Sequence, residues 1–497
     1  MAKQENINKR LIFGLKLKQA RANKGYSLAQ LSDKAGISIS FLNEIEKGKK
    51  HPKPEKVGAI AKALGVSQNW LEASDLDKKL SPLAELIQSN ILHELPLDMF
   101  GLKMGDLLEL LSNAPTKLNA FIGSLIEVTK NYDLSVETFY FAVMRSYQEI
   151  HDNYFEDLEI AAVDFAEQFH LSGNKLVTTE QLQHYLEENW GYEIIEDGFD
   201  GFDDLQNLRS FYRAKGKRRK LYLNKGLNER QKAFIFGKEV AYQFLNLKER
   251  PDTSSWVEIT SFDQVINNFK ASYFSTSILI NQQHFLKDLT KFLKSKKWQE
   301  GVLLETMEQY NATPEMILQR MTNLLPKYFE IKNIFFLRFN HEPHTDHYEL
   351  TKELHLSSSQ SLQGALLREH HCRRWMAFSI LQQLDDMLKL GYKRRAIGGV
   401  QRMRILDTGN EYLTLNLARP NLPTKGVNSS LTLGMLVDEK LKSTVGFVND
   451  KAIKFRLVNE TCERCKAENC KMRVASPRVW RFNKRIASIK ASLEELI

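Results

Sequence analysis

The sequence predicts a multidomain, mainly α protein, with an all-α N-terminal domain, a helical connector and then α+β lobes. The chain has 497 residues, which is too long for one ordinary domain. Caps, glycines and apolar positions at helical spacing crowd the first 72 residues, whereas short apolar runs typical of strands occur farther along. With 42% hydrophobic and 26% charged residues, the composition is that of a soluble globular protein.

Residues 27–48 predict two short helices joined by a tight turn. Ser27 and Gln30 have the spacing of a capping box, in which each side chain satisfies a backbone donor. Gly36 permits the left-handed conformation that ends the first helix, and Ser38 caps the second. Helix, turn and second helix form a helix-turn-helix unit, whose second helix enters the major groove of DNA.

The flanking segments complete a five-helix domain. Residues 8–24 have the apolar pattern of an amphipathic helix, and a further helix over 54–64 begins at Pro54 and ends before Gly65. Together these features resemble the Cro/C1-type repressor domain (XRE family) over residues 8–72. The alternative that the residues leave open is a small helical bundle that binds another protein.

The distribution of charge favours DNA as the partner. Residues 1–65 hold 14 Lys and Arg against five Asp and Glu, a net charge of +9. The whole chain also has a net charge of +9, so the remaining 432 residues sum to zero. All of the positive excess therefore belongs to the helix-turn-helix domain, as binding to phosphates requires.

Position in the helix-turn-helix unit selects the candidate DNA-binding residues. Side chains on the first turns of the second helix can reach base edges, and the lysines that follow it meet backbone phosphates. Asn43 has the chemistry to pair with an adenine, although an exposed helix polar residue is an equal alternative. The candidates are Ser27, Gln30, Ser38, Ser40, Phe41, Asn43, Lys47, Lys49, Lys50 and Lys53.

Two further segments connect this domain to the rest of the chain. Residues 73–82 are polar and contain Pro82, which suits a linker, and 83–170 carry helical apolar stripes. Because Cro/C1-type proteins bind palindromic operators as two-fold dimers, we expect a homodimer formed through this connector. No apolar run is long enough to cross a bilayer and no signal-peptide core is present, so we expect a cytoplasmic protein without a membrane partner.

Residues 171–290 predict an α+β lobe that resembles ImmA/IrrE-type zinc peptidases. The segment FIFGKEVAY (234–242) is similar to their metal-binding helix, with Glu239 at the general-base position. Lys238 and Tyr242 occupy the two positions that a zincin needs as neutral histidines. We therefore expect a degenerate peptidase without enzymatic activity. The alternative is a protease-linked repressor that retains metallopeptidase activity.

Residues 291–497 predict an α+β sensor domain that contains every cysteine of the chain. After a helical stretch over 298–328, strands are predicted at 333–340, 410–417, 431–437 and 444–448. The cysteines are Cys372, Cys462, Cys465 and Cys470.

Three of these cysteines have the spacing C-x2-C-x4-C, and Cys372 is the remaining cysteine for a fourth ligand. Four thiolates suit tetrahedral Zn²⁺ or a 4Fe–4S cluster, and three close cysteines with a remote one favour iron–sulfur. His370 and His371 are alternative ligands. Another interpretation is a buried core cysteine and three free thiols.

The order of these segments resembles the short-chain fatty acyl transcriptional regulator family. The residues that carry the resemblance are Cys372, Trp375, Cys462, Cys465, Cys470, Arg473 and Pro477, with the segments YFSTSILIN and IFFLRFN. The resemblance implies a cytosolic one-component regulator that senses a short-chain acyl-CoA or related metabolite. The stretch 341–352 departs from the more glycine-rich family pattern, which leaves the effector open.

Overall fold

The computed structural model describes residues 2–73, 136–171, 176–216, 218–254, 259–356, 369–391, 396–424 and 426–495. The chain forms two compact units, Met1–Ala142 and Val143–Ile497. The predicted linker, apart from Ala73, and the connector up to residue 135 lie outside the described residues. Among the described helices, none has the length and apolarity needed to cross a membrane.

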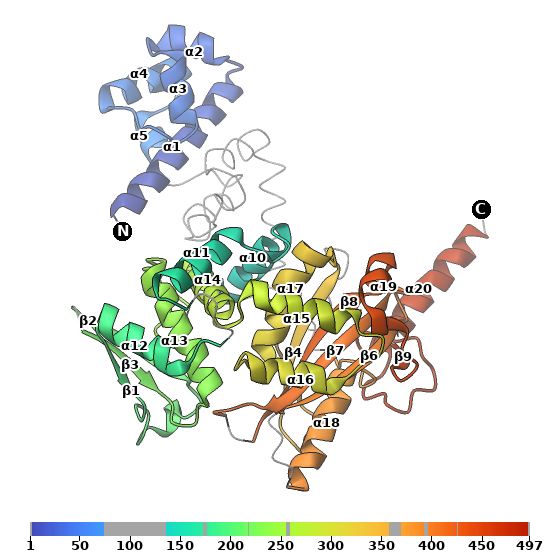
Figure 1. Cartoon of the computed structure of the whole chain (residues 1–497). Coiled ribbons are helices and arrows are strands. Elements are labelled where there is room, and N and C mark those ends of the chain that lie inside the picture. Colours follow the sequence, from blue (N-terminus) through green and yellow to red (C-terminus); the bar gives the residue numbers. More distant parts are fainter. Residues whose placement is uncertain are drawn as a thin grey trace. The chain divides into compact units, whose positions relative to one another are not determined.

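The described part of the N-terminal unit begins with five helices, shown in blue in Figure 1. They are α1 (Ala2–Asn23), α2 (Leu28–Ala35), α3 (Ile39–Glu46), α4 (Pro54–Leu64) and α5 (Gln68–Glu72). One apolar cluster joins them, with Leu17, Leu31, Leu42, Ile60 and Leu71 fully shielded from solvent. This arrangement confirms the helices predicted for this domain, including the cap at Ser27 and the left-handed Gly36, although α1 begins at Ala2 and not at the predicted residue 8.

The second unit combines helices with two sheets (Figure 1). Its helices are α10 (Val136–Ile150, which crosses the unit boundary), α11 (Glu156–Gln168), α12 (Thr179–Trp190), α13 (Glu229–Phe244), α14 (Phe262–Leu279), α15 (Gln282–Lys294), α16 (Glu300–Gln309), α17 (Pro314–Phe329), α18 (Met376–Lys389), α19 (Glu439–Thr444) and α20 (Arg478–Glu494). The strands are β1 (Tyr192–Ile195), β2 (Ser210–Lys215), β3 (Arg218–Leu223), β4 (Ile334–His341), β5 (Tyr348–His355), β6 (Ile397–Ile405), β7 (Glu411–Pro420), β8 (Asn428–Leu436) and β9 (Lys454–Val458).

The smaller sheet has the order β1-β3-β2 and belongs to a lobe that includes α12, α13 and α14. Strand β3 pairs parallel with β1 and antiparallel with β2. Gly237 of α13 lies against Ser275 of α14, where a β-carbon would collide with the serine side chain. The close approach of these two helices forms the core of the lobe.

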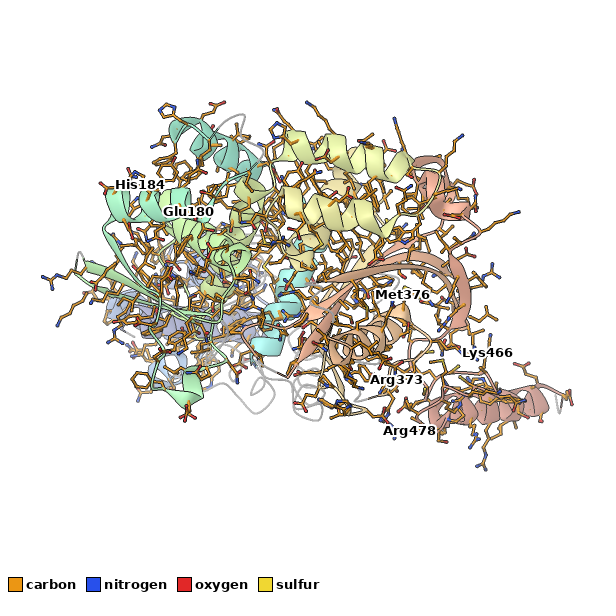
Figure 2. All side chains as sticks on the ribbon, turned by 60° about the horizontal axis from the view of Figure 1, so that its bottom comes forward. Glu180, His184, Arg373, Met376, Lys466 and Arg478 are labelled. Carbon is orange, nitrogen blue, oxygen red and sulfur yellow. The ribbon has the colours of Figure 1, made fainter. Side chains whose placement is uncertain are left out.

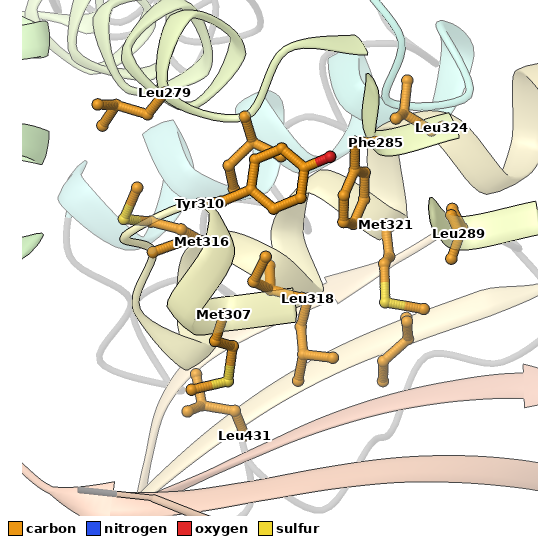
Figure 3. Close-up of a cluster of buried hydrophobic side chains, with 14 of the residues drawn as sticks. Leu279, Phe285, Leu289, Met307, Tyr310, Met316, Leu318, Met321, Leu324 and Leu431 are labelled. Atoms are coloured by element: carbon orange, nitrogen blue, oxygen red, sulfur yellow. The ribbon is translucent and has the colours of Figure 1, made fainter. Parts of the chain in front are cut away.

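The larger sheet has the order β5-β4-β8-β7-β6-β9 and places α17 and α18 on opposite faces. Alternate residues of β4 separate the two sides, since Phe336 joins the cluster beneath α17 and Phe335 joins the one beneath α18. Figure 3 shows the α17 side, where Met307 and Leu318 pack near Leu431 of β8.

Some predicted elements differ from the structure. Residues 444–448 were expected to be a strand, but they form the end of α19 and a 3-10 turn at Gly446–Asn449. The run reads as a strand because it is short, apolar and buried, which periodicity alone does not resolve. The helical pattern expected up to residue 170 is interrupted between α10 and α11, because Asp152 and Asn153 adopt positive φ angles of 50° and 52°.

Three strands of the larger sheet were not predicted. β5 and β9 lie at the two edges and are largely solvent-exposed, so they lack an apolar run. β6 begins with Ile397 followed by two glycines, a pattern that weakens a strand signal.

His355, at the end of β5, predicts a loss of stability in mild acid. Burial, with the charge of Arg145, lowers its pKa from 6.5 to about 4. Because the unfolded chain takes up this proton first, stability falls as the pH drops from about 6.5 to 4. We expect His355→Phe to remove roughly 2 kcal/mol of the difference between pH 7.5 and pH 5 in urea unfolding. His184→Gln, at an exposed position of α12 (Figure 2), should leave that difference unchanged.

Candidate DNA-binding surface and cysteine region

The start of α2 is fixed by reciprocal caps. The backbone N–H of Gln30 donates to Ser27 Oγ at 3.2 Å, and the Ser27 N–H donates to Gln30 Oε1 at 2.8 Å. Both side chains are exposed. Their sequence-predicted capping role is confirmed, while contact with DNA stays a prediction for both residues.

The N-terminal turn of α3 presents a short polar surface. Ser38 caps this helix, with Oγ accepting a hydrogen bond from the Phe41 N–H at 3.4 Å. Ser38 and Ser40 are exposed, and Asn43 is half-buried one turn further along. This placement leaves all three on the part of the helix that the sequence assigned to base contacts.

Phe41 has structural contacts of its own. Its half-buried ring packs against the N-terminal apolar cluster. Lys56 Nζ lies 4.4 Å from the ring centroid, and Lys50 Nζ lies 5.8 Å from it. Anchoring α3 therefore accounts for much of what this residue does.

Ile39 is an exposed residue on α3 that the sequence reasoning missed. It is the first residue of the helix, and 49% of its surface is accessible. An apolar side chain at this position is suited to contact a thymine methyl group. The signal available in the sequence was an isoleucine at a helix start, outside the apolar stripe formed by Leu42 and Ile45.

Cationic side chains follow α3. Lys49, Lys50 and Lys53 are exposed, and Lys47 is the C-cap residue. Lys50 Nζ forms an ion pair with Glu44 at 2.8 Å, so part of its charge is already balanced. The segment nevertheless presents several ammonium groups to solvent next to the polar turn of α3.

The orientation of α3 is held by a buried ion pair and a close helix contact. Arg21 Nε and Nη2 donate to the two carboxylate oxygens of Glu46 at 2.6 and 2.9 Å, and Arg21 Nη1 donates to the Tyr26 carbonyl at 2.8 Å. A β-carbon on Gly14 would collide with the Ile45 carbonyl, so the backbones of α1 and α3 come into close contact there. These contacts give α3 one defined orientation in the domain.

The residues predicted to be the degenerate peptidase positions are linked by hydrogen bonds and ion pairs. Lys238 Nζ donates to Asn268 Oδ1 at 2.6 Å, and the Tyr242 hydroxyl donates to the same atom at 3.3 Å. Arg250 engages both oxygens of Glu239, at 2.6 and 2.7 Å, and lies over the Tyr242 ring. Burial lowers the pKa of Lys238 to about 8. The carboxylate at the predicted general-base position is therefore held by an arginine.

The cysteines converge on one region through backbone contacts. The Cys372 N–H donates to the Glu460 carbonyl at 3.0 Å, and the Cys462 N–H donates to the His370 carbonyl at 2.8 Å. Arg473 Nη1 donates to the Cys462 carbonyl at 2.8 Å, and the Arg473 N–H donates to the Cys470 carbonyl at 3.2 Å. The remote cysteine of the sequence thus lies beside the C-x2-C-x4-C segment.

None of the four cysteines forms a disulfide bond. Burial raises the pKa of Cys372, and the neighbouring Cys462 and Cys465 raise it further. Within the described residues, no group of three or more His, Cys, Asp or Glu side chains is arranged to hold a metal ion. His370 Nδ1 lies 2.8 Å from Glu463 Oε1, which engages one alternative ligand. The metal assignment stays a prediction.

Next to these cysteines, a cavity of about 690 Å³ lies between the Cys465–Glu468 segment and α20. Its lining includes Arg473 and Lys484. Helix α20 has no buried residue and extends from the body of the unit, with Arg478 at its start (Figure 2).

Elemental analysis tests the metal prediction directly. If the four cysteines bind zinc or a 4Fe–4S cluster, anaerobically purified protein should contain stoichiometric zinc or iron, and Cys465→Ser should lose it. A broad visible absorption band should accompany iron. Thr461→Ser, in the same segment, is the matched control and should retain the metal. Unchanged metal content in Cys465→Ser would remove Cys465 from the ligand set.

The region that contains the candidate DNA-binding residues matches a known protein family. Residues 17–71 match a family model described as helix-turn-helix. The chain is 42% identical over 55 residues to the transcriptional regulator ClgR of Mycobacterium tuberculosis strain H37Rv, covering 11% of this chain and 49% of that protein. It is 36% identical over 69 residues to the HTH-type transcriptional regulator SinR of Bacillus subtilis strain 168, covering 14% and 59%.

The chain therefore spans about half the length of these relatives. Among solved structures, it is similar to one described as a Mycobacterium tuberculosis transcriptional regulator, with 16% sequence identity and a TM-score of 0.45. That likeness covers 67% of this chain and 92% of the other. Residues 17–71 of this chain thus form a helix-turn-helix domain, and the chain is similar over 55 to 69 residues to transcriptional regulators.

Proposed function

We propose that the protein is a sequence-specific DNA-binding transcription regulator. The observation that carries the proposal is the polar first turn of α3 followed directly by exposed lysines. Ser38, Ser40 and Asn43 supply side chains that can form hydrogen bonds with base edges, and Lys49 and Lys53 supply positive charge that can pair with phosphates. The helix-turn-helix match over residues 17–71 supports the same partner.

We infer further that the regulator acts as a homodimer on a palindromic operator and responds to a small metabolite. One helix-turn-helix reads only a half-site, so two copies are needed for a specific operator. The resemblance to short-chain fatty acyl regulators suggests a short-chain acyl-CoA or a related acid as the effector. Such a ligand changes DNA binding only if it has different affinities for two arrangements of the dimer.

The peptidase alternative is disfavoured by the contacts of its key residues. A general base has to be available to a water molecule, whereas Glu239 is held by both nitrogens of Arg250. Lys238 stands where a zinc ligand would be and is hydrogen-bonded to Asn268. Specific cleavage of a partner protein that is lost in Glu239→Gln would overturn this part of the proposal.

The proposed function is tested with the full chain and a pool of random-sequence duplexes. Sequencing of the bound fraction should give a palindromic motif, and the affinity for that motif should fall linearly with salt on logarithmic axes. Addition of acetyl-CoA or propionyl-CoA should change the affinity, whereas free CoA serves as the control for the acyl group. Recovery of no enriched sequence, or an affinity that does not depend on salt, would contradict DNA recognition.

Asn43→Ala tests base readout on α3. Removing a side chain that pairs with adenine is expected to cost roughly 1–3 kcal/mol on the preferred operator and to relax the preference at one base pair. Fluorescence anisotropy with operators substituted at each position measures both effects. In comparison, Lys53→Ala should lower the affinity for all duplexes by the same factor. A uniform loss in Asn43→Ala would contradict direct readout by this residue.

A further inference from the structure

In one region of the second unit, basic side chains outnumber carboxylates. Four basic side chains surround Glu315 of α17, and we call this set the basic cluster. Its cations are Arg209, Arg338, Lys352 and Arg419. They come from the segment before β2 and from strands β4, β5 and β7, so the cluster joins the smaller lobe to the larger sheet.

Sheet register explains why three of these cations meet. Arg338 of β4 is paired with Lys352 of β5 on one side and with Leu431 of β8 on the other. Leu431 is paired with Leu417 of β7, and Arg419 lies two residues beyond Leu417. Residues directly opposite each other, and residues two apart, share a face, so the three cations lie on the α17 face of the sheet.

The hydrogen bonds around Glu315 leave donors unused. Lys352 Nζ lies 3.1 Å and Arg338 Nη1 lies 3.3 Å from the Glu315 carboxylate, and Arg338 Nη2 donates to Asn421 Oδ1 at 2.9 Å. In the part of the chain that the structure describes, the buried Nε atoms of Arg338 and Arg419 have no hydrogen-bond partner. Arg419 is only 6% exposed, so its guanidinium group is largely shielded from bulk solvent.

The charges do not balance either. Four cations against one carboxylate leave a net charge of +3 in a mostly buried site. Burial and the neighbouring Arg209 lower the pKa of Arg419 to about 10, and burial together with Arg338 lowers the pKa of Arg209. Although burial opposes it, the same cations hold the pKa of Glu315 far below its usual range. Buried charges of one sign are costly unless something compensates them.

Two other buried arginines of this unit each face a carboxylate, although the Nε atom of Arg250 also lacks a hydrogen-bond partner among the described residues. Arg320 faces Glu159 with both terminal nitrogens, and Arg250 faces Glu239 in the same way. Each of these guanidinium groups therefore has its own carboxylate. The basic cluster departs from this pattern, and the compensating group is one that a ligand can supply.

We propose that the basic cluster is the site of an anionic small metabolite, whose phosphate or carboxylate groups bind Arg209, Arg338 and Arg419. Planar guanidinium groups recognise both kinds of anion through paired hydrogen bonds. The site rests on the proposed function, because it gives the effector of the regulator a location. Gln231 Nε2 of α13 donates to the Leu422 carbonyl at 2.6 Å beside the cluster, so an anion held there bridges the two lobes.

Thermal unfolding of the full chain tests the site. Acetyl-CoA, pyrophosphate and citrate are the probes, and sodium chloride at the same ionic strength is the control for nonspecific screening. At a probe concentration of about 100 times Kd, Tm should rise by roughly 4 °C. A response to pyrophosphate without citrate identifies a phosphate site, and the reverse identifies a carboxylate site. No response beyond that of chloride to any probe would overturn the proposal.

Two variants separate a binding site from a structural cluster. Arg419→Leu removes an unpaired buried charge, so it should raise Tm without probe and abolish the response to it. A lower Tm with an unchanged response would contradict the proposal. If Arg419→Leu does not fold, Arg209→Gln should weaken probe binding at least tenfold by calorimetry. Arg404→Gln, at a half-exposed arginine on β6 that pairs with Glu411, is the matched control and should respond normally.

Failure of the metabolite site can be distinguished from failure of the proposed DNA-binding function. DNA binding is measured on the same preparation without any probe. Normal operator binding with no probe response would overturn only the metabolite site. A probe response in a protein that binds no duplex would retain the site and remove the DNA-binding proposal.

Discussion

Reversing the charges of Lys49 and Lys50 is expected to weaken binding to every duplex by a factor on the order of 100 at about 0.1 M salt. Each lysine that meets a phosphate releases a counterion, and Glu at either position repels the same phosphate. The slope of log affinity against log salt should become shallower by about 2 for each bound domain. Fluorescence anisotropy of Lys49→Glu/Lys50→Glu over a salt series measures both quantities.

The matched control reverses the same amount of charge elsewhere in the domain. Lys24 and Lys62 are exposed and lie on neither α3 nor the segment after it. Lys24→Glu/Lys62→Glu should therefore change the affinity much less. Circular dichroism is needed for the test variant, since Glu at position 50 loses its ion pair with Glu44. Equal losses in the two double variants would show general attraction without a specific surface.

Breaking the buried pair between Arg320 and Glu159 is expected to destabilise the second unit by about 3–5 kcal/mol. Arg320 is fully buried, and its Nη2 donates to Glu159 Oε2 at 2.8 Å. Tyr273 donates to the same carboxylate at 2.8 Å, so the pair joins α11, α14 and α17. Glu159→Gln leaves the guanidinium uncompensated, and urea unfolding should show the loss as a lower midpoint.

A double variant isolates the charge from the packing. Glu159→Leu/Arg320→Met removes both charges and should recover most of the stability lost in the single variant. The dependence of stability on acid pH provides a second readout. Burial raises the pKa of Glu159, but the charge and hydrogen bonds of Arg320 lower it by more, so the net change is downward. The stabilisation is therefore present above the ordinary glutamate pKa and is lost as the pH falls below about 4.5. Additive losses in the double variant would contradict a compensated pair.

Local sequence signals predicted the elements in which nearby side chains satisfy the backbone hydrogen-bonding groups. The caps at Ser27 and Ser38, the left-handed Gly36 and the start at Pro54 each act within a few residues, so the helices of the N-terminal domain were predicted correctly. Edge strand β5 was missed because its side chains are mostly polar and its pairing partner is β4. A strand of that kind is specified by its neighbour.

The sequence by itself determined where the positive charge lies, since fourteen cations and the capped helix pair lie within the first 65 residues, and this placement predicts DNA as the partner. It also determined that Lys238 and Tyr242, and no histidines, stand at the two positions that the resemblance to zinc peptidases predicts as metal ligands. Only the tertiary structure shows that Arg250 forms an ion pair with Glu239. It also shows that three arginines lie around Glu315, namely Arg209, Arg338 and Arg419. These residues are up to 210 positions apart, and their charges meet only because sheet register and helix packing bring them together.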